Sequence, residues 1–281
     1  MRIGLYFLVL VFFSEILFAK TQTVELALSF DDAPGFDTPY FKSENRADKL
    51  LEILKRRKIK GAIFFINICN HQDVTRSIEI TRKYLKAGHF IGNHTCMHYS
   101  YQEVSYDKFV DDVLLNQKYM NRAGFVSKDK YFRFPFFHEG QSVQKRDKIH
   151  HWLKQQNYTN VPATIYTDDY KYDEKINKKL NKKDQLKVEQ ELMLKSINEQ
   201  IDLSLELSQK LFNRQVKHNI ILHELDLTVD SLDRIIDLIV AKNIKIVPFD
   251  KIITDPIYNL KTTSTQTKQG LLQQLKYEKN N

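Results

Sequence analysis

The chain is poor in the residues that define several specialised protein classes. Its 281 residues include only 2 Cys, 8 Gly and 6 Pro. Two cysteines are too few for a disulfide scaffold or for a zinc module with four thiolate ligands. So little glycine and proline excludes collagen-like and low-complexity classes. The patterns G-x-x-x-x-G-K-[ST], G-x-G-x-x-G and G-x-S-x-G are also missing, which removes the common glycine-rich phosphate sites and the serine nucleophile elbow.

What is present is an ordinary globular composition with an excess of positive charge. Hydrophobic residues make up 42% and charged residues 28% of the chain, so a sizeable core can form without disulfides. The length corresponds to one or two domains. The net charge of +8 is compatible with a nucleic acid, a membrane surface or an acidic polymer as partner and selects none of them.

The first residues are typical of a targeting segment. A positive start is followed by the apolar run Ile3–Phe13, and a small residue, Ala19, precedes a polar stretch. We predict a signal peptide over residues 1–19, with an uncleaved anchor as the alternative. The run is interrupted at Glu15 and falls short of the about 20 apolar residues that span a bilayer. We therefore expect export to the periplasm or secretion, with no stable membrane span after cleavage.

Export bears on the two cysteines, Cys69 and Cys96. An oxidising compartment allows them to form a disulfide. The sequence alone leaves two separate buried thiols as an equally good interpretation.

After the leader, strand patterns alternate with helix patterns. Near-continuous apolar strands between amphipathic helices predict parallel strands buried under helices, and their number favours a single-domain barrel over residues 20–262. Chemistry in such barrels gathers at the carboxyl ends of the strands. The expected strands are Val24–Phe30, Ala62–Ile68, Phe90–Gly92, Tyr131–Phe137, Val161–Thr167, Ile220–Leu222 and Ile244–Val247. The expected helices are Glu44–Lys58, Val74–Ala87, Ser105–Arg122, Val143–Gln156 and Asp230–Lys242.

Two segments depart from this alternation. Residues 171–217 are rich in lysine at first and have a helical apolar pattern later, so we expect one or two long helices that form an insertion packed on the barrel. Residues 263–281 are polar, and we expect a loose, flexible tail.

Polar residues follow several of the predicted strands. Asp31 and Asp32 end the first strand, and two adjacent carboxylates call for a nearby cation. His94 and His98 follow the third strand. Two histidines four residues apart lie on one face of a helix and can reach one metal ion, if this segment is helical.

Later strands end in the same way. Arg133 leads out of one strand, Asp168 and Asp169 end another, and His223 directly follows an apolar strand. Taken singly, such residues are more often turn caps, solvated charges or hydrogen-bonded structural histidines. A barrel would bring all of these strand ends to one rim, and this coincidence favours a functional site.

These residues belong to five ordered segments that resemble known motifs. The segments are residues 28–34 (LSFDDAP), 94–98 (HTCMH), 133–136 (RFPF), 169–170 (DY) and 221–223 (ILH). They are similar to the motifs of the polysaccharide deacetylases, the NodB-homology group of carbohydrate esterase family four. The resemblance runs from about Val24 to Pro256, with the insertion between the fourth and fifth motifs.

The resemblance implies a distorted (β/α)7 barrel with a helical insertion and hydrolysis of an N-acetyl group on an aminosugar-containing glycan such as peptidoglycan or chitin. It also implies a divalent metal ion, zinc in the first place with cobalt or nickel as alternatives. The implied metal ligands are Asp32, His94 and His98. The implied catalytic residues are the general base Asp31, the general acid His223, Arg133 that orients the base, Asp169 that holds the acid, and Phe136 whose backbone N–H binds the oxyanion.

The chain departs from the usual motifs at positions that concern substrate fit. Ala33 replaces a glycine after the Asp pair, and Tyr166 and Tyr170 stand where an aspartate and a tryptophan are common. Ile221 replaces a leucine, and Phe136 replaces a tyrosine. Because none of these is an implied metal ligand or acid–base side chain, we expect the catalytic set to be complete.

Two other functions stay open at this stage. One is a non-catalytic glycan-binding envelope protein on the same barrel, and the other is a deacylase of a small amide or imide. Nucleic acid is not an expected partner, because no groove-reading motif accompanies the positive charge. Nothing in the sequence indicates an oligomeric state.

Overall fold

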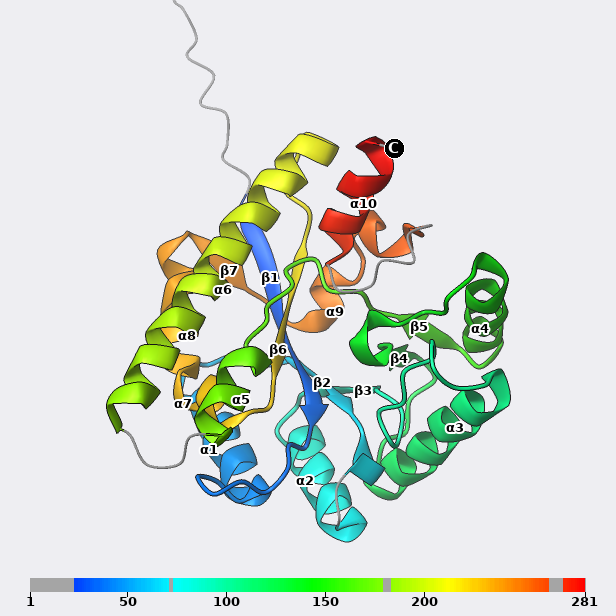
Figure 1. Cartoon of the computed structure of the whole chain (residues 1–281), viewed down its shortest axis with the longest axis horizontal. Helices are drawn as coiled ribbons and strands as arrows, with labels where there is room; N and C mark the ends of the chain where they lie inside the picture. Colours follow the sequence, from blue (N-terminus) through cyan, green and yellow to red (C-terminus); the bar gives the residue numbers. More distant parts are fainter. Residues whose placement is uncertain (1–22, 71–72, 179–182, 263–269, 281) are drawn as a thin grey trace, which may run out of the picture.

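The computed structural model describes residues 23–70, 73–178, 183–262 and 270–280. The predicted signal peptide lies outside these residues. The described chain forms one sheet of seven parallel strands in the order β5-β4-β3-β2-β1-β6, with β7 paired to β1. Helices cover the sheet, which curls around its own interior (Figure 1). The predicted fold class, a distorted (β/α)7 barrel, is confirmed.

The strands are short except for β1. They are β1 Val24–Ala33, β2 Ile63–Ile66, β3 Phe90–Asn93, β4 Lys130–Phe132, β5 Tyr158–Asn160, β6 His218–His223 and β7 Ile244–Ile246. The α-helices are α1 Ser43–Arg56, α2 Val74–Lys86, α3 Tyr106–Arg122, α4 Val143–Gln155, α5 Tyr170–Lys178, α6 Lys183–Phe212, α7 Asp226–Asp230, α8 Leu232–Ala241, α9 Phe249–Ile252 and α10 Leu271–Asn280. Three 3₁₀ turns complete the list: η1 Ile68–Asn70, η2 Pro135–Phe137 and η3 Pro256–Asn259.

The strand period of two divides β1 between two environments. Leu26, Leu28 and Phe30 are buried in the main core, which lies between the sheet and the helices. Ala27 belongs to a second cluster that includes residues of other strands, and Ser29 donates to the Ile220 carbonyl of β6 at 2.8 Å. Alternate side chains therefore face the helices and the barrel interior. Asp31 is the next interior position after Ala27 and Ser29, both of which are buried.

One predicted strand, Tyr131–Phe137, is too long, and another, Val161–Thr167, is wrong because the strand there is Tyr158–Asn160. Each predicted segment contains a proline. The ladder of β4 stops at Phe132, and Pro135 begins the turn η2. The ladder of β5 covers Tyr158–Asn160, before Pro162, and the chain then touches β6 at one bridge between Ile165 and Ile220. Proline has no N–H to donate to a ladder, so both segments continue as irregular chain that approaches the rim.

The inserted segment contains two helices, as expected, and its long helix is part of the core. Met193, Ile197 and Ile201 of α6 are buried members of the main core. Figure 1 shows α6 along one side of the molecule, and it contacts both α8 and α10.

The prediction of a loose tail is wrong for its second half. Leu271 and Leu272 of α10 are buried in the second cluster, because this helix covers apolar surface beside α6. Residues 263–269 lie outside the described part of the chain. No helix in the described ranges combines the length and the apolar character that a membrane span needs.

Candidate functional site

The two aspartates at the end of β1 diverge because the strand is irregular there. The pairing of β1 with β2 shifts register between Phe30 and Ala33, and Asp32 has a left-handed backbone with φ 56°. Aspartate tolerates this conformation better than most residues. Asp31 is buried, whereas Asp32 is partly exposed and accepts a hydrogen bond from Asn67 Nδ2 at 3.1 Å.

The segment that carries His94 and His98 is a loop, so the helical interpretation of their spacing is wrong. Thr95 and His98 have left-handed backbones, with φ values of 63° and 56°. The Asp112 carboxylate accepts from the backbone N–H of Met97 at 3.1 Å. Side chains that bind backbone N–H groups compete with helix formation, and the two left-handed residues turn both imidazoles toward Asp32.

Asp32, His94 and His98 form a cluster with the spacing of a metal site. Their ligand atoms all lie within 4.8 Å of one another. Asp32 Oδ1 is 3.1 Å from His98 Nε2 and 3.7 Å from His94 Nε2. Tetrahedral zinc with bonds of about 2.1 Å would place its ligand atoms roughly 3.4 Å apart, so the three donors fit such an ion.

The protonation of His94 also suits a ligand. Burial lowers the pKa of His94 to about 4, so the ring is neutral near pH 7. Its Nδ1 lies 2.8 Å from the Arg133 carbonyl oxygen, which fixes the proton on Nδ1 and leaves the Nε2 lone pair directed at the cluster. Burial opposes ionisation of Asp32, but His98, His223 and His94 together lower the pKa of this carboxyl below its ordinary value.

Arg133 holds Asp31 from below. Its side chain is completely buried, and Nη1 donates to Asp31 Oδ1 at 2.5 Å and to Ser29 Oγ at 2.9 Å. Its Nε donates to the Val161 carbonyl at 2.9 Å, which orients the guanidinium plane. The second oxygen of Asp31 lies 3.7 Å from His94 Nε2. One carboxylate oxygen is thus anchored, while the other faces the cluster of Asp32, His94 and His98.

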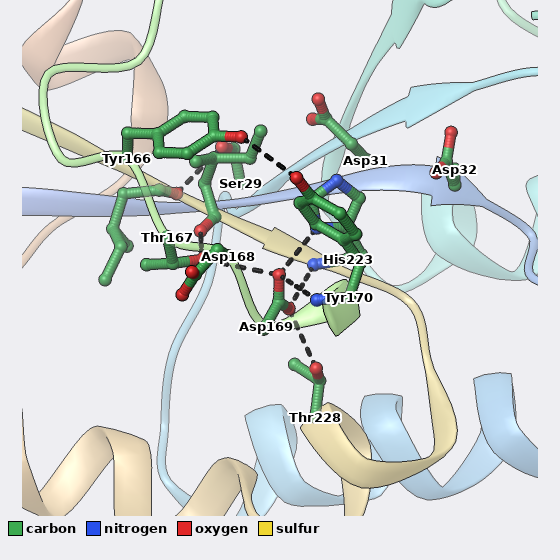
Figure 2. Close-up of polar contacts among 12 residues, drawn as sticks. Ser29, Asp31, Asp32, Tyr166, Thr167, Asp168, Asp169, Tyr170, His223 and Thr228 are labelled. Carbon is green, nitrogen blue, oxygen red and sulfur yellow. Dashed lines mark hydrogen bonds and ion pairs between the residues drawn. The ribbon is translucent and has the colours of Figure 1, made fainter. Parts of the chain in front are cut away.

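At the end of β6, beside β1, His223 is held by Asp169, which lies in the loop before α5 (Figure 2). Asp169 is fully buried, and its Oδ1 lies 2.6 Å from His223 Nδ1. Its Oδ2 accepts from Thr228 Oγ1 at 2.8 Å. Burial works against a charged imidazole, but the Asp169 carboxylate and the carboxylates of β1 raise the pKa of His223 to about 9.

These groups surround one cavity of about 440 Å³. Of the predicted site residues, Asp31, Asp32, His94, His98, Phe136 and His223 line it. Arg133 and Asp169 lie behind Asp31 and His223 and act on the cavity through them. The Phe136 ring is half exposed and lies 4.5 Å from the His98 ring between centroids.

One wall of the cavity comes from residues that the sequence analysis missed. Asp173 and Glu174 of α5 line it beside Tyr166 and Tyr170, and the two tyrosine hydroxyls lie 3.5 Å apart. Burial raises the pKa of Asp173 to about 6. The strand-end rule could not find these acids because they lie on a helix, although the position of α5 directly after Asp169 was a usable signal.

Sequence comparison agrees with this geometry over the first half of the chain. The sequence model of a family described as polysaccharide deacetylase matches residues 19–161. This stretch, about half of the 281 residues, contains Asp31, Asp32, His94, His98 and Arg133.

Two curated relatives align over a similar number of residues. A peptidoglycan-N-acetylglucosamine deacetylase from Bacillus cereus is 28% identical over 149 residues, which are 52% of this chain and 46% of that protein. A chitin deacetylase from Arthroderma benhamiae is 26% identical over 166 residues, which are 57% of this chain and 39% of that protein. The chain thus spans about half the length, or less, of the curated relatives it matches.

Solved structures extend the likeness of the fold to most of the chain. The chitin deacetylase of Colletotrichum lindemuthianum has a TM-score of 0.58 at 20% identity, covering 82% of this chain and 88% of that one. A pseudoenzyme of carbohydrate esterase family four from Bacillus anthracis has a TM-score of 0.56 at 16% identity, covering 83% of this chain and 66% of that one. The match of the family model over residues 19–161 shows that the chain belongs to the polysaccharide deacetylase family, and the common barrel agrees with it.

Proposed function

We propose that the chain is an exported, metal-dependent deacetylase that hydrolyses N-acetyl groups of an aminosugar-containing glycan. The observation that carries this proposal is the arrangement of three units around one cavity: the pair Asp31–Arg133, the pair His223–Asp169, and the cluster of Asp32 with its two histidines. Base, acid and metal donors are the parts that amide hydrolysis by an activated water requires.

Asp32, His94 and His98 would hold a divalent ion, with zinc as our first choice and cobalt or nickel as alternatives. Their two imidazole nitrogens and one carboxylate oxygen are a donor set typical of catalytic zinc, in which a further position stays open. When bound, such an ion lowers the pKa of a coordinated water and polarises a carbonyl.

Asp31 is the general base in this proposal. Its Oδ1 is bonded to Arg133 and its Oδ2 side faces the cluster, so the carboxylate is oriented to take a proton from the attacking water. The buried guanidinium fixes the position of the Asp31 carboxylate. The backbone N–H of Phe136, at the cavity wall, would stabilise the negative charge on the acetyl oxygen.

His223 is the general acid. An amine leaves poorly as an anion, so it must receive a proton as the C–N bond breaks. With its pKa raised to about 9, the imidazole is protonated at neutral pH. Asp169 holds Nδ1 and leaves Nε2 as the atom that delivers the proton into the cavity.

The glycan class is inferred from the relatives. One is a peptidoglycan deacetylase and another acts as a chitin deacetylase, and both names imply N-acetylglucosamine units. The net charge of +8 would favour an anionic envelope polymer such as peptidoglycan. A signal peptide over residues 1–19 would deliver the protein to that polymer in the periplasm or outside the cell.

The decisive experiment measures acetate released from peptidoglycan, from chitin oligosaccharides and from a panel of small amides, with zinc, cobalt or nickel added to metal-free protein. We expect release from a glycan by wild type, with rates reduced about 10²- to 10⁴-fold in Asp31→Asn and strongly reduced in His223→Ala. Wild-type rates in these variants would refute the assigned roles. Release from small amides alone would identify an amide deacylase.

A non-catalytic glycan-binding protein is the second candidate, because one structural neighbour is a pseudoenzyme. Retention on a glycan without acetate release under any of the three metals would identify that function. The complete set of Asp31, His223 and cluster residues favours the enzyme.

A further inference from the structure

A disulfide joins the loop that carries His94 and His98 to the segment that follows β2. Cys69 and Cys96 are bonded, with their Cα atoms 4.7 Å apart. Cys96 is fully buried and stands midway between His94 and His98 in the loop after β3. Cys69 is in the turn η1, which follows β2. The bond therefore joins the ends of two neighbouring strands at the rim of the cavity.

The segment of Cys69 supports the third member of the cluster. Asn67, two residues before Cys69, donates from Nδ2 to Asp32 Oδ1 at 3.1 Å. The backbone N–H of Ile68 donates to Asn116 Oδ1 at 3.0 Å, and Asn116 also donates to Asn93 Oδ1 at 2.9 Å. The turn that carries Cys69 is thus part of the frame that orients Asp32.

The loop of Cys96 needs outside support to keep its shape. Thr95 and His98 have the left-handed backbones already described, and such residues persist only where their surroundings hold them. The noncovalent contacts that hold the loop include two from its own backbone: Thr95 N–H donates to Asn93 Oδ1 at 2.9 Å, and Met97 N–H donates to Asp112 at 3.1 Å. The disulfide adds a covalent tie at the centre of the loop, between these points.

We propose that the Cys69–Cys96 disulfide is a positioning element of the metal site. It fixes the loop that carries both histidine ligands against the segment that orients Asp32, so that the three donors stay preorganised before an ion binds. This inference rests on the proposed metal-binding function. Its consequence is a site whose metal affinity depends on the oxidation of one cysteine pair, which suits an oxidising compartment.

A purely structural disulfide would behave differently. Closing a chain separation of 27 residues constrains the unfolded chain and raises global stability, but it would leave the affinity of the folded protein for metal unchanged. Metal affinity of folded, full-length protein therefore separates the two roles. Because the chain has only 2 Cys, removal of this pair alters no other thiol chemistry.

The test is a Co²⁺ titration of metal-free wild type and of the double variant Cys69→Ser/Cys96→Ser, followed by the visible absorption of bound cobalt and by competition with a chelator. We expect affinity to fall by about tenfold or more in the double variant, as it does when groups that orient ligands are lost elsewhere. Hydrogen exchange of residues 94–98 in the metal-free protein should become faster as well.

Met193→Ala is the matched control, because Met193 is buried in α6, outside the cavity lining. It should lower the thermal midpoint and leave the Co²⁺ affinity unchanged. Equal affinity in wild type and the double variant would overturn the inference and leave the proposed function intact. If wild type bound no Co²⁺, the metal-binding function and the inference would both fall. The same holds if the His98→Ala variant bound Co²⁺ as tightly as wild type.

If the double variant does not fold, wild-type protein with its disulfide reduced is used instead. The protein is treated with a phosphine reductant, two free thiols per chain are verified by titration, and the reductant is removed without oxygen before Co²⁺ is added. Weaker binding than in the oxidised protein supports the positioning role, and unchanged binding overturns it.

Discussion

Asp169 binds His223 at two places, the backbone and the ring. Its Oδ2 accepts from the backbone N–H of His223 at 2.8 Å, and its Oδ1 lies 2.6 Å from the ring nitrogen Nδ1. One buried carboxylate therefore fixes both where the residue sits and how its ring is turned. The same contact raises the pKa of the imidazole, so position and protonation depend on a single side chain.

Asp169→Asn should separate these two effects. The amide keeps the shape but loses the charge that holds the pKa of His223 at about 9. We expect the alkaline limb of the kcat/KM profile of acetate release to move from near pH 9 toward 6.5 or below. Asp168→Asn is the control, because Asp168 bonds Lys171 and Ser196 instead of His223. Identical profiles for Asp169→Asn and wild type would contradict the assignment of His223 as the acid.

The raised pKa of His223 also makes the free energy of unfolding depend on pH, and Asp169→Asn should remove this dependence. The pKa of folded His223 lies above its ordinary value of 6.5, so the stabilisation is complete below pH 6.5 and is lost as pH rises through about 9. A shift of this size corresponds to about 3 kcal/mol. Urea unfolding at pH 6 and pH 10 should show wild type losing that much more free energy of unfolding than Asp169→Asn. Parallel losses in the two proteins would refute the linkage.

Arg133→Gln should destabilise the fold as well as the activity. The change leaves Asp31 buried without its cation, and breaking a buried pair from one side costs about 3–5 kcal/mol. Arg234→Gln provides the contrast, because its partner Glu191 is exposed, and urea unfolding should detect little change. A small effect of Arg133→Gln on the free energy of unfolding would contradict the view that the fold depends on this buried ion pair.

Metal binding should stabilise the chain through the three clustered donors. At a free ion concentration one hundred times the dissociation constant, linkage predicts about 2.7 kcal/mol of added stability. Calorimetry should record this increase for wild type and its loss in His98→Ala or after chelation. His150→Ala, which breaks the pair with Glu139 away from the cluster, should keep it. An equal gain in His98→Ala would place the ion elsewhere.

The order of polar strand ends was enough to predict which residues meet at the rim. In the sequence, apolar strand-like segments end at or just before five polar residues, and parallel strands bring such ends together. These residues are Asp31, His94, Arg133, Asp169 and His223. The path of the chain between them was harder to predict. The spacing of two histidines is the same in a helix and in a loop, and only distant side chains such as Asp112 decide between them.

Other errors had local causes that the sequence contained. Pro135 and Pro162 interrupt segments whose apolar content resembled strands. The acids of α5 were missed because a helix, and not a strand end, brings them to the cavity. The strand pattern thus failed where a proline could not donate a hydrogen bond. The strand-end pattern failed where a helix supplied the side chains of the cavity.

The polar tail offers a last test of how the barrel is closed. The tail has leucines at helical spacing in a polar sequence, at Leu271, Leu272 and Leu275. The first two are buried in the second cluster described above. Leu272→Ala should therefore lower the free energy of unfolding by about 2–5 kcal/mol, measured by urea titration. Lys276→Ala in the same helix is exposed and should change it little. Because Leu272 is not among the residues that line the cavity, Leu272→Ala should leave metal affinity unchanged. A matching loss in both variants would mean that helix propensity, and not burial, stabilises this segment.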